Sequence, residues 1–183
     1  MSSIPEDFDD AYQEDSGPFA RFFDSFNGLQ PIADLLLRLT VAWAFYASGI
    51  TRVVSEPLAN AFGLNVSYPT SLTPTESTLT LYANEYHVPF LTPELAAQIG
   101  TAAEIVLPVL IVLGLFGRLG ALGLFIFNIV AVVSYPAGMW AADGSPTPGL
   151  YLHLLWGLML LIIVAHGPGK ISIDHLVRKA VSS

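Results

Sequence analysis

Two ionisable residues stand inside long apolar runs of this chain, where their side chains could do chemistry. Glu104 lies in the run 101–136, and His153 lies in the run 150–166. A carboxyl group and an imidazole can pass a proton between them or hydrogen-bond a polar head group such as a quinone ring. A buried pair of this kind can also do no more than fix how helices pack. Both interpretations stay open here.

Apolar helices must position these side chains. The chain has 183 residues, 53% hydrophobic and only 12% charged, whereas soluble domains carry about 25% charged residues. We expect helices at about 32–54, 95–116, 119–136 and 150–166, each near the roughly 17–25 residues that cross hydrocarbon. Helices two to four have no charged stripe to face water. The sequence therefore predicts an all-α fold, an integral membrane four-helix bundle.

The remaining segments flank this bundle or connect its helices. Residues 1–29 are rich in Asp and Glu, which is typical of a disordered leader that binds nucleic acid poorly. Residues 30–170 form the transmembrane domain, and its loop of about 40 residues between helices one and two is expected to fold over one mouth of the bundle. Residues 171–183 are expected to form a short amphipathic tail.

The basic residues predict the orientation of the bundle. Arg118, in the expected turn between helices two and three, lies on the same side as Lys170 and Arg178. Cytoplasmic flanks are enriched in Lys and Arg, so both termini are expected in the cytoplasm and the long loop outside. Arg52 lies near the other side, where we expect it in the outer interfacial belt.

Depth and helix faces predict a polar site. Glu104 and His153 both lie roughly 18–20 Å from the cytoplasmic ends of their helices at 1.5 Å per residue. Both share a face with small residues, which pack between membrane helices, so both are expected to point inward. Tyr46 falls near the same level. We predict a site of Glu104, His153 and Tyr46, with Trp43 and Trp156 just below it.

Other polar residues favour structural roles. Asp34 and Arg38 are four residues apart, the spacing of an ion pair on a helix, and with Arg118 they are expected to anchor the bundle at the membrane surface. The chain has no cysteine and four histidines, none of them paired at the spacing of a metal site. We therefore expect no metal site within this chain.

Three stretches together resemble the DoxX family over about residues 30–178. They are "LLLRLTVAWAFYASGITRV", "EYHVPFLTPELAAQIGTAAEIVLPVLIVLGLFGRLGAL" and "HLLWGLMLLIIVAHGPGKISIDHLV". The chain departs from the family in its acidic leader and in Thr51-Arg52, where a lysine motif often follows the glycine. The resemblance implies a multi-pass four-helix bundle in a bacterial-type inner (plasma) membrane. The family is named after a subunit of an archaeal thiosulfate:quinone oxidoreductase, and it implies no catalytic residue here.

These observations lead to three hypotheses about function. The first is a small subunit of a quinone-linked membrane redox system that acts with a partner enzyme. Its cofactor would be borrowed, because the chain has no haem, flavin or metal motif. The second is a non-enzymatic scaffold that recruits partner proteins, and the third is a conduit for protons or small solutes. Whether the chain is an enzyme stays open, and so small a bundle could also self-associate in the lipid bilayer.

Overall fold

Four long apolar helices dominate the structure, a computed structural model that describes residues 26–61 and 63–182. They are 18–21 residues long and apolar enough to cross a membrane: α2 (Gln30–Ile50), α4 (Pro93–Leu113), α5 (Gly117–Ser134) and α7 (Pro148–His166). At most 44% of the apolar window of any of them is buried, so most of these side chains face outward, where only lipid can cover them. The chain is a multi-pass membrane protein, and the four expected membrane helices are confirmed.

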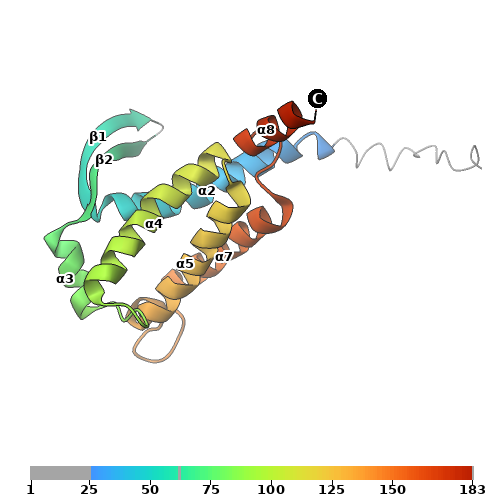
Figure 1. Cartoon of the computed structure of the whole chain (residues 1–183). Coiled ribbons are helices and arrows are strands. Elements are labelled where there is room, and N and C mark those ends of the chain that lie inside the picture. The colour runs from blue at the N-terminus through green and yellow to red at the C-terminus, as the bar shows by residue number, and fades with distance from the viewer. Residues whose placement is uncertain (1–25, 62, 183) are drawn as a thin grey trace, which may run out of the picture.

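Helices α4 and α5 form an antiparallel hairpin and diverge away from their turn (Figure 1). Gly114 ends α4 with a φ of 63°, and a Cβ there would lie 2.4 Å from the Cβ of Ser172, so both backbone conformation and space require glycine. Gly117 and Arg118, the expected turn, are instead the first residues of α5. Helix α2 packs on α4, and α7 packs on α5. The core between them is apolar: Val41, Phe45, Ile111, Leu124, Leu160 and Ile163.

Polar contacts fasten the end of the bundle that holds the α4–α5 turn, here called the turn end. Arg38 is 1% exposed, and its guanidinium donates to the carbonyls of Ile111 and Val112 at 3.2 and 3.1 Å and to that of Ile171. Although the spacing predicts an ion pair with Asp34, none joins the two residues in the described chain. The open carbonyls at the end of α4 take the guanidinium instead.

A short C-terminal helix completes the turn end. Helix α8 (Ile173–Val181) is capped by Ser172, whose hydroxyl accepts from the backbone N–H of His175 at 3.2 Å. The carboxylate of Asp174 accepts from the backbone N–H groups of Phe116 and Gly117 at 2.9 and 2.8 Å, which caps the start of α5. Arg118 donates to the carbonyl of Ala165 at 3.2 Å. These bonds tie the tail to the bundle, whereas most of the predicted leader lies outside the described residues.

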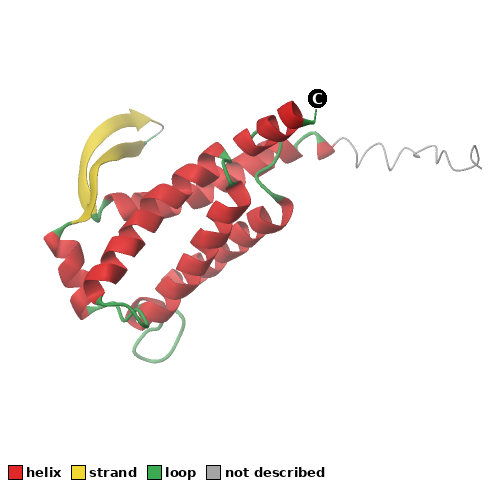
Figure 2. Ribbon diagram, viewed as in Figure 1, coloured by secondary structure: helices red, strands yellow, loops and turns green. Residues whose placement is uncertain are grey.

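The segment between α2 and α4, at the opposite end of the bundle, is folded rather than a plain loop. Strands β1 (Val53–Ala61) and β2 (Leu64–Pro74) pair as an antiparallel hairpin, and helix α3 (Glu76–Asn84) follows (Figure 2). Prolines at 57, 69 and 74 argue against strands in the sequence. Both strands are edge strands, however, and an edge strand can leave a backbone position unpaired. This end is called the hairpin end below.

The hairpin end also rests on the sides of the bundle. Tyr46 of α2 donates its hydroxyl to the carbonyl of Ser67 in β2 at 2.7 Å. Gln98 of α4 donates to the carbonyl of Leu72 at 3.1 Å. Helix α3 is capped by Thr75, whose hydroxyl accepts from the backbone N–H of Thr78 at 3.3 Å. The expected loop thus becomes a hairpin and a capped helix, and α2 ends at Ile50 instead of near residue 54.

Candidate functional site

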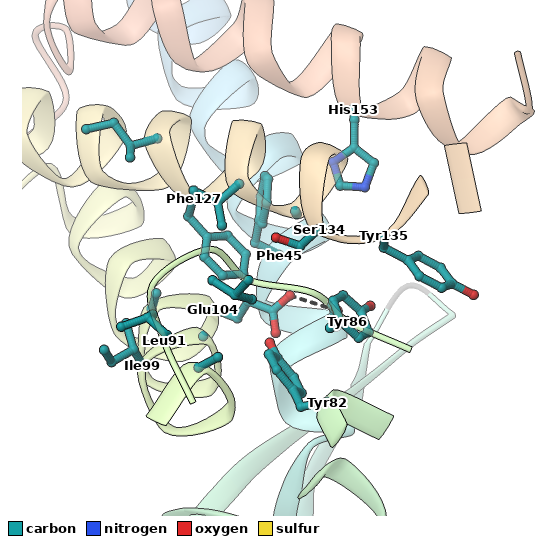
Figure 3. A pocket seen from close by; sticks show the side chains of 18 of the residues that line it. Phe45, Tyr82, Tyr86, Leu91, Ile99, Glu104, Phe127, Ser134, Tyr135 and His153 are labelled. Atoms are coloured by element: carbon teal, nitrogen blue, oxygen red, sulfur yellow. Dashed lines mark hydrogen bonds between the residues drawn. The ribbon is translucent and has the colours of Figure 1, made fainter. Parts of the chain in front are cut away.

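A cavity of about 660 Å³ lies at the hairpin end between α2, α4, α5 and α7. Helix α3 and the segment after it contribute Tyr82, Tyr86 and residues 88–91 to its wall. Most of the lining is apolar or aromatic, and polar groups reach it from several elements (Figure 3). A cavity of this size with a few convergent polar groups is typical of a binding site for a small organic molecule.

An ion pair between Arg52 and Glu104 is the strongest polar feature of this cavity. Nε of Arg52 lies 2.5 Å from Oε2 of Glu104, and the two side chains are only 11% and 5% exposed. The hydroxyl of Ser48 donates to Oε1 of Glu104 at 3.1 Å. A lone charge inside the membrane costs about 2.5–3.5 kcal/mol on insertion scales, and the guanidinium offsets most of that cost. Arg52 is therefore not a member of the outer interfacial belt, as the sequence predicts, but the buried partner of Glu104.

Small residues let the helices approach closely around this pair. A Cβ on Gly49 would lie 2.8 Å from the Cβ of Glu104, and a Cβ on Gly100 would lie 2.4 Å from the hydroxyl of Tyr82. Any larger side chain at either position would push α2 from α4 or displace the tyrosine. The glycines therefore position Glu104 and Tyr82 at the cavity wall.

Aromatic rings surround the guanidinium of Arg52. Its Cζ lies 5.4 Å from the ring centroid of Tyr82 and 5.7 Å from that of Tyr86, within the range of cation–π attraction. The Tyr82 and Tyr86 rings stack at 4.7 Å, and Tyr135 stacks on Tyr86 at 4.9 Å. Burial lowers the pKa of Arg52, but Glu104 and the tyrosines raise it by more, so the net shift is upward. The guanidinium therefore stays charged, while burial raises the pKa of Tyr82 to about 12.

His153 lines the same cavity but has a different partner. Its Nδ1 lies 2.7 Å from Oδ1 of Asn128, whose amide nitrogen donates to the His153 carbonyl at 2.9 Å. The ring meets Trp156 edge-on at 5.0 Å between centroids. No hydrogen bond or ion pair joins Glu104 and His153 among the described residues. The two residues share one cavity, but the pairing expected between them is wrong: Arg52 holds Glu104 and Asn128 holds His153.

Of the other predicted site residues, one lines the cavity and two do not. Trp156 lines the cavity, and its ring lies 5.4 Å from that of Phe45. Tyr46 and Trp43 are not among the lining residues, and the Tyr46 hydroxyl is bonded to the hairpin. The depth estimate stays a prediction, and the Tyr46 side chain reaches a strand that sequence reasoning does not predict.

Several cavity residues escape sequence reasoning. Arg52, Tyr82 and Ser134 line the cavity, and none was expected there. Arg52 leaves one signal, because it is the only Lys or Arg between residues 39 and 117 and so the only such cation near Glu104. For Tyr82 and Ser134 we identify no such signal in the sequence. In the described part of the chain, no cluster of His, Cys, Asp and Glu could hold a metal ion.

Comparisons with known proteins bear on the part of the chain that holds the ion pair. The DoxX family model matches residues 33–137, more than half of the chain, which includes Arg52 and Glu104 but not His153. An uncharacterized protein of Haemophilus influenzae is 28% identical over 147 residues, or 79% of this chain and 83% of that protein. No solved structure matches the chain.

Proposed function

The chain is a member of the DoxX family, and we propose that it is the quinone-binding membrane subunit of a redox system that acts with a partner enzyme. One observation carries the proposal: the wall of an apolar cavity between membrane helices includes polar side chains with atoms that have no hydrogen-bond partner among the described residues. Nη1 of Arg52 and Oγ of Ser134 are buried and have no hydrogen-bond partner in the described chain. Both residues line the cavity.

The chemistry of a quinone fits this lining. Its ring is flat and apolar and carries two carbonyl oxygens, which accept hydrogen bonds and donate none. Phe45, Phe127 and Trp156 offer aromatic surfaces to such a ring, and Nη1 of Arg52 can donate to one of its oxygens. Because an unpaired buried donor costs about 1–3 kcal/mol, an acceptor that reaches the guanidinium is favoured. The cavity also lies within the range of about 300–1,000 Å³ that holds small organic ligands.

The isoprenoid tail of a quinone also has an exit. Ile99 of α4 and Ile126 of α5 both line the cavity and are 50% and 54% exposed. The cavity wall therefore continues into the lipid-facing surface between these diverging helices. A ring held near Arg52 could leave its tail between α4 and α5 in the bilayer, where the molecule is already dissolved.

The chain's own residues would bind and orient the ring, and a partner would exchange electrons with it. A bound quinone supplies reversible two-electron, two-proton chemistry. Arg52, held in place by Glu104, would donate to one end of the ring and Ser134 to the other.

The membrane orientation belongs to the same proposal. Arg118, Lys170, Arg178 and Lys179 gather at or beyond the turn end, which favours a cytoplasmic location for that end. At the hairpin end Arg52 is neutralised by Glu104. The turn end would then face the cytoplasm of a bacterial-type cell and the hairpin end the outside of its inner membrane.

Binding of a short-chain quinone to the protein in lipid nanodiscs tests the proposal. The probe is decyl-benzoquinone, and the readout is quenching of tryptophan fluorescence. Saturable binding is expected, with a loss of affinity of at least about tenfold in Arg52→Gln, since a charged hydrogen bond contributes about 1.5–3 kcal/mol. Tyr46→Phe is the matched control, because its hydroxyl bonds to the hairpin and not to the cavity. Folded protein without saturable binding would refute the proposal and favour a scaffold.

A further inference from the structure

The hydrogen bonds of Asn128 determine which nitrogen of His153 carries the proton. The amide nitrogen of Asn128 donates to the His153 carbonyl at 2.9 Å, which fixes the orientation of the amide group. The amide oxygen must then be the atom 2.7 Å from Nδ1. An amide oxygen can only accept, so Nδ1 is the protonated nitrogen. In the neutral ring, Nε2 is left with a free lone pair.

Packing reinforces this arrangement. Asn128 is 4% exposed, and a Cβ on Gly157 would lie 3.3 Å from its amide nitrogen. The amide group therefore lies close against the backbone of α7, one turn beyond His153. Rotation of the amide would place its NH2 group against Nδ1 and its oxygen against the His153 carbonyl, which leaves two acceptors facing each other. The tautomer is thus held by two bonds and by the space around them.

The free nitrogen faces the cavity. His153 is a lining residue and its ring reaches from α7 toward the space beside Ser134 and Tyr135 (Figure 3). Nδ1 is taken by Asn128, and no partner for Nε2 is present among the described residues. The cavity therefore has an acceptor at this end, while Arg52 provides a donor in another part of its wall.

We propose that Nε2 of His153 accepts a hydrogen bond from a hydroxyl group of the bound ligand, so that the cavity binds the quinol form in preference to the quinone. The inference rests on the proposed function and adds which redox form the site selects. A quinol hydroxyl can donate to Nε2. A quinone carbonyl would present its own lone pairs to that nitrogen, and both acceptors would stay unpaired.

The other polar groups of the cavity do not reverse this preference. Arg52 donates to an oxygen, which both redox forms possess. Oγ of Ser134 can donate or accept, because a hydroxyl rotates to suit its partner. Glu104 accepts, and so it too suits a hydroxyl better than a carbonyl. His153 is then the group whose partner differs most between the two forms, and a preference of about tenfold or more is expected from one unpaired buried acceptor.

Affinities of the two redox forms provide the test. The wild-type protein in nanodiscs is titrated anaerobically with decyl-benzoquinone and, separately, with the corresponding quinol. Tighter binding of the quinol by about tenfold or more is expected. In His153→Phe the two affinities should become similar, while Trp43→Phe, whose ring does not line the cavity, should keep the wild-type ratio. Equal affinities in the wild type, tighter quinone binding, or an unchanged ratio in His153→Phe would overturn the inference and leave quinone binding itself intact.

A spectroscopic measurement tests the tautomer independently. With ¹⁵N-labelled histidine, the His153 ring should show a protonated Nδ1 and an unprotonated Nε2 near neutral pH, assigned by the signal that His153→Phe removes. Asn128→Ala removes both bonds without adding volume to this close-packed contact, so it should give a mixture of tautomers and a smaller quinol preference. A protonated Nε2 in the neutral wild-type ring would overturn the inference. If neither redox form binds, the proposed function fails and this inference with it.

Discussion

Removal of the Arg52 guanidinium should destabilise the protein far more than removal of an exposed arginine. In Arg52→Met the carboxylate of Glu104 would lose the nitrogen 2.5 Å from its Oε2. It would keep the hydroxyl of Ser48, a neutral donor. A 5% exposed side chain has almost no access to water that could replace the missing charge.

The expected loss follows from three contacts. Breaking a buried ion pair by removing one partner costs about 3–5 kcal/mol. The two tyrosine rings at 5.4 and 5.7 Å from Cζ add about 0.5–1 kcal/mol each for cation–π attraction. Arg52→Met should therefore lower the free energy of unfolding by about 3–5 kcal/mol or somewhat more. The double variant Arg52→Met/Glu104→Met should recover much of this loss, because an apolar replacement of a buried pair is often close to neutral.

Equilibrium unfolding in mixed detergent micelles measures these differences. The wild type, both single variants and the double variant form a cycle from which the coupling energy is obtained. Arg178→Met is the control, since Arg178 is exposed on α8 and should change stability by no more than about 0.5 kcal/mol. A loss below about 1 kcal/mol in Arg52→Met would place the pair among surface ion pairs and refute the account of a buried, neutralising partner.

Further expectations concern helix contact, the turn end and the buried tyrosine. Gly49→Ala should destabilise by about 1–3 kcal/mol in the same unfolding assay, because its Cβ would lie 2.8 Å from that of Glu104; an unchanged midpoint would show that α2 and α4 can separate freely. Asp174→Ala should cost about 0.5–2 kcal/mol through the lost cap of α5, whereas Glu56→Ala, at an exposed position of β1, is the control that should cost little. Tyr82 should ionise near its raised pKa of about 12, later than an ordinary tyrosine at about 10. Its neutral form is the one favoured by folding, so this stabilisation is complete below about pH 10 and is lost as the pH rises toward 12. Absorbance near 295 nm should then show one fewer late-titrating group in Tyr82→Phe, and identical titrations would contradict the assignment.

Much of the membrane domain could be predicted from the sequence because lipid imposes simple rules on it. A helix that crosses hydrocarbon must be long and apolar, so four such runs give four helices. Small residues mark the faces where these helices pack, which is why Glu104 and His153 were both expected to point inward and do line one cavity. Periodicity and length thus determine helices and their inner faces.

The partners of these residues could not be predicted in the same way. Arg52 follows the end of α2, where the chain turns into β1, and helical periodicity says nothing about a residue beyond the helix. The turn carries its side chain back over Glu104, while the sequence suggested the membrane interface. Tyr46 illustrates the same limit, because its hydroxyl bonds to a strand that the three prolines argue against. The partners of Glu104 and Tyr46 come from segments that fold back on the bundle, and such tertiary contacts cannot be inferred from helical periodicity.

Photolabelling with an azido-quinone tests most directly whether the cavity beside Arg52 and Glu104 holds a quinone. The protein in native membranes is irradiated with the probe, and labelled peptides are identified by mass spectrometry, with and without excess unlabelled quinone. The proposal predicts adducts on cavity residues such as Phe127 and Met139 that excess quinone suppresses. Adducts confined to lipid-facing residues such as Leu119 and Leu161, which are 66% and 48% exposed, and insensitive to competition would contradict it.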